Sequence, residues 1–357
     1  KVFFRLVIRK AGNMREWIAV VITALFLTGC MQETKNREFD AQYFDYFDTF
    51  TTFTVYAEDE EQFQEYKELF ESELKNYHQL FDIYESYQGL NNIKTINDNR
   101  GITPVQTDEE IVRLIKFARD EYETTNGRVN VAMGSVLSLW HKYRTDGIAH
   151  PEQAEIPPMQ ELRKAAEHMD IEAVRIDETR SLVYLEDSAM SLDVGAVAKG
   201  YAAQRICEKL REAGVSSALI SIGGNVQTIG TKGNGSPWRV GVQNPDTSSG
   251  QSYLYALKLQ DLALVTSGTY QRYYEVDEVR YHHIIDPETL MPGQEFASVT
   301  ILSPNGARAD ALSTAVFNMP LEEGMAFVES LEDTEAFWVY EDGREVFSSG
   351  FENYVEK

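Results

Sequence analysis

Ala218-Leu219-Ile220-Ser221-Ile222, followed by Gly223-Gly224-Asn225, is an apolar run that ends in a glycine turn. A short run of this kind, bounded by turn residues, is typical of a buried β-strand. Further runs of this character lie near residues 238–242, 253–259, 262–266 and 282–285. Together these runs predict a substantial, largely antiparallel sheet.

Apolar spacings of three and four residues predict helices before and after these strands in the chain. The predicted helices cover residues 60–83, 108–124, 159–169, a segment that follows residues 191–201 and ends at 213, a segment from near 309, and 321–331. Other strands are expected at 43–56, 173–176 and 182–185, and a loop at 145–158. Since no Pro- or Gly-rich linker or repeat divides residues 41–357, we predict one α+β unit with helices packed on a sheet.

The charge balance of the 357 residues is strongly acidic. There are 57 Asp and Glu against 33 Lys and Arg, a formal net charge of -24. Such a surface repels nucleic-acid phosphate, so we expect no DNA or RNA partner. It also repels a polyphosphate ligand unless a metal or helix N-termini neutralise the local field, although the acid excess can equally serve solubility alone.

The N-terminal region resembles an export signal. A charged start at Met14 precedes the apolar residues 18–27, and Thr28-Gly29-Cys30 follows. The apolar segment is short for a permanent membrane span, and its end resembles the lipobox of bacterial lipoproteins. We therefore expect a signal peptide over residues 1–29, a lipidated Cys30, a polar tether to residue 40, and anchoring at the extracytoplasmic face of the cell membrane. The alternative is an uncleaved anchor with an incidental cysteine.

The other cysteine, Cys207, lies in an amphipathic helical pattern. With Cys30 carrying lipid it has no disulfide partner, so we expect a small core residue.

Two glycine-containing segments could approach an anion. Asp193-Val-Gly195-Ala196-Val-Ala-Lys199-Gly200 leads into a helix, whose free N–H groups and Lys199 would favour negative charge. Gly223-Gly224-Asn225 lacks dinucleotide-binding spacing. Taken alone, either segment can be an ordinary turn.

Asp310 and Thr314 are four residues apart in a helix that is otherwise largely apolar. They would lie on one face, and a buried aspartate needs a partner such as a cation. Oxygen ligands favour Mg²⁺. His282 and His283 end a predicted strand, where they should point to opposite faces, so that one can serve as a general base while the other packs. A structural histidine remains the alternative.

In order along the chain, these segments resemble the ApbE family of Mg²⁺-dependent FAD:protein FMN transferases. The matching segments cover residues 47–52, 89–98, 193–201, 222–225, 266–268, 283–287 and 309–314. Two positions depart from the family pattern. Phe47-Asp48-Thr49 stands where Met-Gly-Thr is common, and Thr289-Leu290-Met291-Pro292 where Thr-Gly-aromatic-Pro is usual.

The resemblance implies an ApbE-like fold related to the T-fold, and transfer of FMN from FAD to a threonine or serine of a client protein. Asp310 and Thr314, helped by the backbone carbonyl of Ala196, would bind Mg²⁺ or Mn²⁺, and His283 would be the base. The resemblance also implies a flavin-nucleotide pocket formed by Phe47, Ala132, Met133, Gly134, Asp193, Lys199 and Ile284. Hydrolysis of FAD to FMN and AMP, or FAD binding without chemistry, are the alternative functions.

Overall fold

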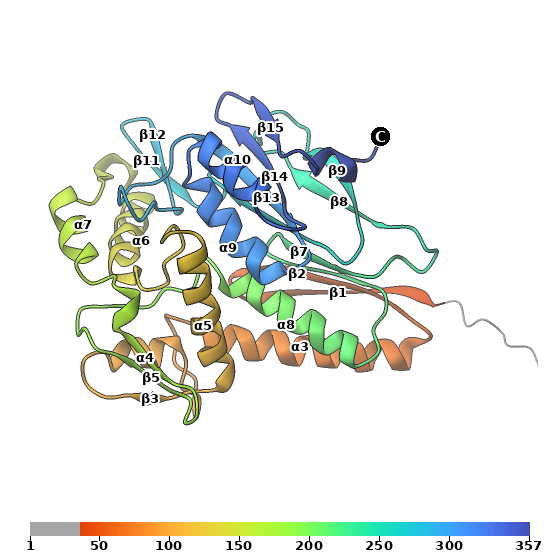
Figure 1. Cartoon of the computed structure of the whole chain (residues 1–357), viewed down its shortest axis with the longest axis horizontal. Helices are drawn as coiled ribbons and strands as arrows, with labels where there is room; N and C mark the ends of the chain where they lie inside the picture. The colour runs from red at the N-terminus through yellow and green to blue at the C-terminus, as the bar shows by residue number, and fades with distance from the viewer. Residues whose placement is uncertain (1–35) are drawn as a thin grey trace, which may run out of the picture. The chain divides into compact units, whose positions relative to one another are not determined.

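The centre of the fold is an eight-stranded antiparallel sheet (Figure 1). The computed structural model describes residues 36–357. In spatial order the strands are β1 (Arg37–Tyr46), β2 (Thr49–Ala57), β6 (Ala218–Ile222), β7 (Asn225–Ile229), β10 (Ala263–Gly268), β13 (Phe296–Ser303), β14 (Glu335–Tyr340) and β15 (Glu345–Phe347). Every residue of β13 is buried, whereas buried and less buried residues alternate along β2. β13 is therefore covered on both faces.

Three helices cover one face of this sheet: α3 (Glu60–Phe81), α8 (Ala198–Glu212) and α9 (Gly306–Phe317). Asp59 begins α3 by accepting a hydrogen bond from the N–H of Gln62, and Asn305 caps α9 in the same way. The ring of Phe70 on α3 stacks on Phe53 of β2, with centroids 4.4 Å apart. Burial of such an aromatic side chain contributes about 1.5–3 kcal/mol.

The opposite face carries a smaller apolar cluster beneath the hairpin of β8 (Trp238–Gln243) and β9 (Tyr253–Leu259). Val242 and Leu257 of the hairpin join Phe337 of the main sheet in this cluster. The helices and the hairpin thus enclose the sheet on its two faces.

The remaining elements lie together beyond one end of the helical layer (Figure 1). They include α6 beside α7 and the β11–β12 hairpin, and α4 and α5 beside a three-stranded sheet of order β3-β5-β4. Their bounds are α4 (Ile93–Asp98), β3 (Val105–Gln106), α5 (Glu109–Thr124), α6 (Gly134–Ala149), α7 (Met159–Ala166), β4 (Val174–Asp177), β5 (Leu182–Leu185), β11 (Tyr273–Val276) and β12 (Val279–His282); α10 (Leu321–Glu329) packs near β14.

The α+β class and the antiparallel sheet are confirmed, and Cys207 is a buried core residue as predicted. Gly223 and Gly224 form the turn between β6 and β7, with φ of 57° and 90°. Residues 37–357 form one compact unit. No helix within the described residues is both long and apolar enough to cross a membrane.

Several boundaries differ from the prediction. Residues 43–56 are not one strand but parts of two, because Phe47 and Asp48 turn the chain at φ of 54° and 50°. The tether was predicted to reach residue 40, yet β1 begins at Arg37 because its backbone pairs with β2. The loop predicted at 145–158 is shorter, since α6 continues to Ala149. β12 ends at His282 rather than continuing to residue 285. The predicted signal peptide and Cys30 lie outside the described residues.

Candidate active site

The site is built where α8 and α9 come closest. A Cβ added at Gly200 would lie 2.3 Å from the Cβ of Asp310 and 2.5 Å from the carbonyl oxygen of Gly306, so only glycine permits this approach. The N–H of Gly200 donates to Oδ2 of Asp310 over 2.7 Å. Gln204 adds a second hydrogen bond between the two helices, because its Oε1 accepts from the N–H of Gly306 at 2.9 Å.

Asp310 is a buried carboxylate, 5% exposed. Burial raises its pKa, while the positive charge of Lys199 and the N–H of Gly200 oppose that change. A buried anion with so little compensation favours an additional positive partner.

Oxygen donors for such a partner lie along the same two helices. Thr314, one turn after Asp310 on α9, is partly exposed. The carbonyl of Ala196 precedes α8 and accepts no backbone hydrogen bond from residues 36–357. Within the described part of the chain, no cluster of three or more His, Cys, Asp or Glu could hold a metal. One carboxylate, one hydroxyl and one carbonyl fit a hard cation such as Mg²⁺, which keeps several waters, and do not fit zinc.

The loop that carries Asp193 and Ala196 is held by two distant segments. The side chain of Asn97 forms two hydrogen bonds with the backbone of Leu192: it donates to the carbonyl at 2.9 Å and accepts from the N–H at 2.7 Å. The N–H of Asp193 donates to Val131, and the N–H of Gly134 to Ser191. These bonds place residues 131–134 beside Asp193.

The carboxylate of Asp193 accepts the N–H of Gly195 at 2.9 Å. Burial raises its pKa, opposed by that N–H, His141, Arg144 and Lys199. Asp193 is partly exposed, so it marks a polar recess that is open to solvent.

The two adjacent histidines have different environments. His282 is 4% exposed; its Nε2 donates to the carbonyl of Gly293 and its Nδ1 accepts the N–H of Ile284 at 3.2 Å. His283 instead has a solvent-accessible side chain. Partial desolvation by the surrounding protein lowers its pKa well below the ordinary value, as do Arg272, His282, Lys199 and Arg144. His283 is thus a neutral imidazole at pH 7, able to accept a proton.

Most of the other residues predicted for the nucleotide pocket could contact a ligand only through their backbone atoms. Ala132, Met133, Gly134 and Ile284 are buried, so their side chains pack inside the fold. Phe47 lies in the β1–β2 turn, where its N–H donates to Nδ1 of His78 at 3.2 Å. No measured contact joins Phe47 to Asp310 or His283, although its neighbour Asp48 influences the pKa of Tyr84, as Asp193 does.

Four residues near Asp193 and His283 were not predicted: Tyr84, His141, Arg144 and Arg272. The rings of Tyr84 and His141 lie 5.5 Å apart, and Arg144 bonds to Nδ1 of His141 at 3.1 Å. His141 and Arg144 are one turn apart on α6, and this i, i+3 spacing was the one sequence signal that could have identified the pair.

Comparison with known proteins gives a consistent result. A model of the ApbE family matches residues 47–338. A FAD:protein FMN transferase of Klebsiella pneumoniae is 33% identical over 276 residues, which cover 76% of this chain and 83% of that protein. One of Treponema pallidum is 31% identical over 277 residues, 74% of each chain. The crystal structure of the ApbE protein of Thermotoga maritima superposes with a TM-score of 0.77 at 29% identity, covering 90% of this chain and all of that one.

Proposed function

This chain belongs to the ApbE family, and from that membership and the oxygen donors on α8 and α9 we propose that it transfers FMN from FAD to a threonine or serine hydroxyl of a client protein, releasing AMP. The observation that carries the proposal is the buried Asp310 carboxylate beside Lys199, with a neutral His283 facing solvent nearby. Such an arrangement suits a reaction in which a phosphate ester is transferred to a hydroxyl.

Asp310, Thr314 and the carbonyl of Ala196 would hold Mg²⁺ or Mn²⁺. The bound cation would supply charge neutralisation for the FAD diphosphate. Lys199 adds a fixed positive charge next to Asp310. The Gly200 N–H holds the carboxylate in place, which limits the reorganisation needed during the reaction.

His283 would accept the proton of the client hydroxyl through its neutral ring. The hydroxyl oxygen then forms a bond to the phosphorus of the FMN half, the bond between that phosphorus and the bridging oxygen breaks, and AMP leaves with the electron pair. Asp193, Lys199 and the backbone of residues 132–134 would bind the nucleotide. His282 fixes the backbone on both sides of His283 through its hydrogen bonds to Gly293 and Ile284.

One experiment separates transfer from the two alternatives. The purified chain is incubated with FAD, Mg²⁺ and a flavinylation-acceptor domain, and flavin fluorescence is measured on the denatured acceptor. Covalent label with one AMP per FMN supports transfer. AMP without label means hydrolysis of FAD, and bound FAD with neither product means a binding protein; either result refutes the proposal.

We also propose that Cys30 is lipidated and holds the enzyme at the extracytoplasmic face of the membrane; the Leu27-Thr28-Gly29-Cys30 sequence supports this. Cells expressing the chain are fed an alkyne-labelled fatty acid. Label and membrane association in the wild type, with both lost in Cys30→Ser, are expected. Equal membrane association of the variant would contradict the proposal.

A further inference from the structure

Two arginines next to the site form no ion pair with any of residues 36–357. Arg128 and Arg205 form ion pairs with carboxylates. Arg144 and Arg272, in contrast, have no carboxylate of residues 36–357 within ion-pair distance; Arg144 contacts Nδ1 of His141. Both arginines flank the contact between α6 and β11, because Gly147, three residues after Arg144, meets the ring of Tyr274, two residues after Arg272. Burial lowers the pKa of Arg144, and the positive charge of Arg272 lowers it further. Asp193 is the one carboxylate whose charge raises the pKa of Arg144, and it forms no ion pair with it. Two guanidinium groups thus face a single nearby carboxylate, and this local excess of positive charge, in a chain of net charge -24, favours an external anion.

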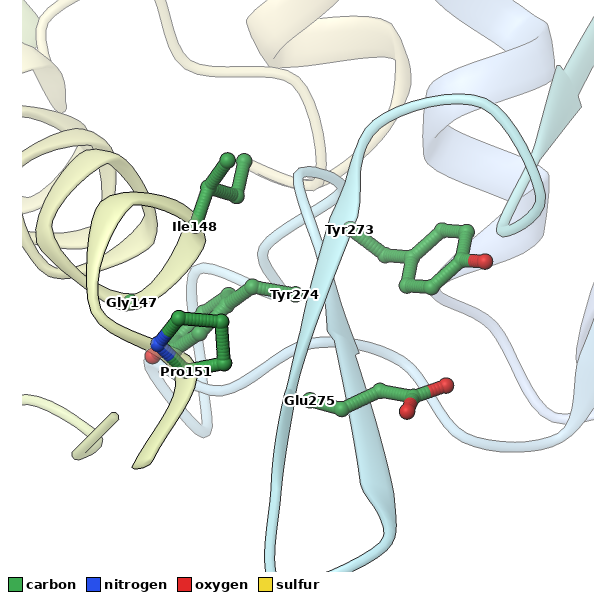
Figure 2. Close-up of a pocket in the computed structure, with 6 residues that line it drawn as sticks. All are labelled: Gly147, Ile148, Pro151, Tyr273, Tyr274 and Glu275. Carbon is green, nitrogen blue, oxygen red and sulfur yellow. The ribbon is translucent and has the colours of Figure 1, made fainter. Parts of the chain in front are cut away.

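A groove lies directly beside the pair, between the end of α6 and β11 (Figure 2). Gly147, Ile148 and Pro151 form one wall, and the other is formed by Tyr273, Tyr274 and Glu275. Arg144 is four residues before Ile148, on the same face of α6, and Arg272 immediately precedes Tyr273.

The two walls of the groove are in close contact. A Cβ at Gly147 would lie 2.6 Å from the ring of Tyr274, so α6 and β11 are in close contact there. The hydroxyl of Tyr274 donates to the carbonyl of Glu155 at 3.0 Å. Figure 2 shows the Tyr274 ring directed toward Pro151, with Tyr273 and Glu275 on the other side of the strand. Ile148 is 61% exposed and offers apolar surface.

Size and position indicate what the groove binds. Its volume of about 260 Å³ is smaller than the roughly 300–1,000 Å³ of pockets for drug-sized ligands, so FAD does not fit it. Tyr273 pairs with His282 in the β11–β12 hairpin, so Arg272 stands opposite His283 at the end of that ladder. The charges of Arg144 and Arg272 lower the pKa of His283, whereas Lys199 is the cation that lowers the pKa of Asp310. Arg144 also acts on the pKa of Asp193, so the two arginines border the proposed nucleotide pocket on the side of the proposed base. A hydroxyl that delivers its proton to His283 can come from this side.

We propose that Arg144, Arg272 and the groove bind the segment of the client protein that carries the acceptor hydroxyl, the arginines binding an acidic side chain of that segment and the groove an adjacent apolar one. This inference rests on the proposed transferase function. It makes the two arginines specificity-determining residues for the protein substrate, not for FAD.

The test uses the full chain and the acceptor domain of the labelling assay. In the double variant Arg144→Gln/Arg272→Gln, the KM for the acceptor should rise by about tenfold or more, as expected for loss of charge-assisted hydrogen bonds, with little change in the KM for FAD. Ile148→Glu, at an exposed position, should raise the acceptor KM by electrostatic repulsion. Lys142→Gln is the matched control, because Lys142 is exposed and points about 160° away from Arg144 around α6.

The outcomes are distinct. Unchanged acceptor KM in the double variant and in Ile148→Glu overturns the inference. A matching rise in the KM for FAD also overturns it, since the arginines would then serve the nucleotide phosphates. Absence of label with wild-type enzyme refutes the proposed function itself. An acceptor whose acidic residues near the target are changed to amides should label poorly with wild type and lose its difference between wild type and the double variant.

Discussion

Gly200→Ala is the most direct test of how the fold positions Asp310. The added Cβ would lie 2.3 Å from the Cβ of Asp310, well inside the ordinary contact range that begins at 3.4 Å. It also meets the backbone carbonyl of Gly306 at 2.5 Å, which cannot rotate away as a flexible side chain could. The two helices must therefore separate by about 1 Å at this crossing.

The displacement has two consequences of different size. Overpacking costs about 1–3 kcal/mol, offset in part by the helix preference of alanine over glycine of about 1 kcal/mol. We expect a melting temperature lower by at most about 3 °C, with the protein still folded. A shift of about 1 Å in a catalytic group can cost about 100-fold in rate, so FMN transfer should fall far more than stability does.

The assay compares initial rates of acceptor labelling with thermal unfolding for wild type, Gly200→Ala and Gly324→Ala. Gly324 is also a buried helical glycine, on α10, but its added Cβ would meet only side chains, at 3.3–3.6 Å. The control should keep full activity. A folded Gly200→Ala enzyme that labels within about twofold of wild type would show that the close approach does not position Asp310.

Three further changes test the electrostatics of the site and the core. In Asp310→Asn the metal-free protein should be at least as stable as wild type at pH 8, because burial raises the pKa of that carboxyl. Acceptor labelling should nevertheless fall by about 100-fold or more. Unchanged labelling by a variant whose urea unfolding shows that it is folded rejects the cation site. Since the pKa of His283 is lowered, kcat/KM for labelling should fall on the acid side only below pH 6; a fall that begins at or above pH 6.5 contradicts the assignment. His283→Gln should lower kcat/KM by about 100-fold. Buried Glu121 has a pKa raised to about 7, so the wild type loses stability as pH rises through that value. Glu121→Gln should therefore raise the free energy of unfolding at pH 8 by at most about 3 kcal/mol, seen as a higher melting temperature, and have little effect at pH 5. Equal shifts at both pH values would argue against a titrating carboxyl.

The parts of the site that were predicted share a local signal. Asp310 and Thr314 are one helical turn apart, a relation that the spacing alone specifies once α9 is predicted. His282 and His283 were expected to face opposite ways, and the buried and accessible environments of the two rings confirm this. Short-range periodicity is sufficient in both cases.

The parts that were missed depend on contacts between distant segments. Asn97 holds Leu192 across 95 residues, and nothing in its own neighbourhood indicates that pairing. Arg144 lies just before the segment predicted as loop, so its position on the face of α6 beside β11 could not be derived. The β1–β2 turn was missed because Phe47 adopts a positive φ, which is rare for a bulky side chain, although Asp48 beside it is a residue type common in turns.

The cations near His283 produce two effects that reinforce each other. A histidine can be kept neutral by complete burial, but a buried ring could not meet a protein substrate. Here enclosure by the surrounding protein together with Arg272, Lys199 and Arg144 lowers the pKa while the ring keeps an accessible side. The same three charges create a local positive potential on a chain of net charge -24. One arrangement thus keeps the proposed base neutral and attracts the anionic groups of FAD and of the client segment, so raising the salt concentration should weaken acceptor binding before it impairs folding.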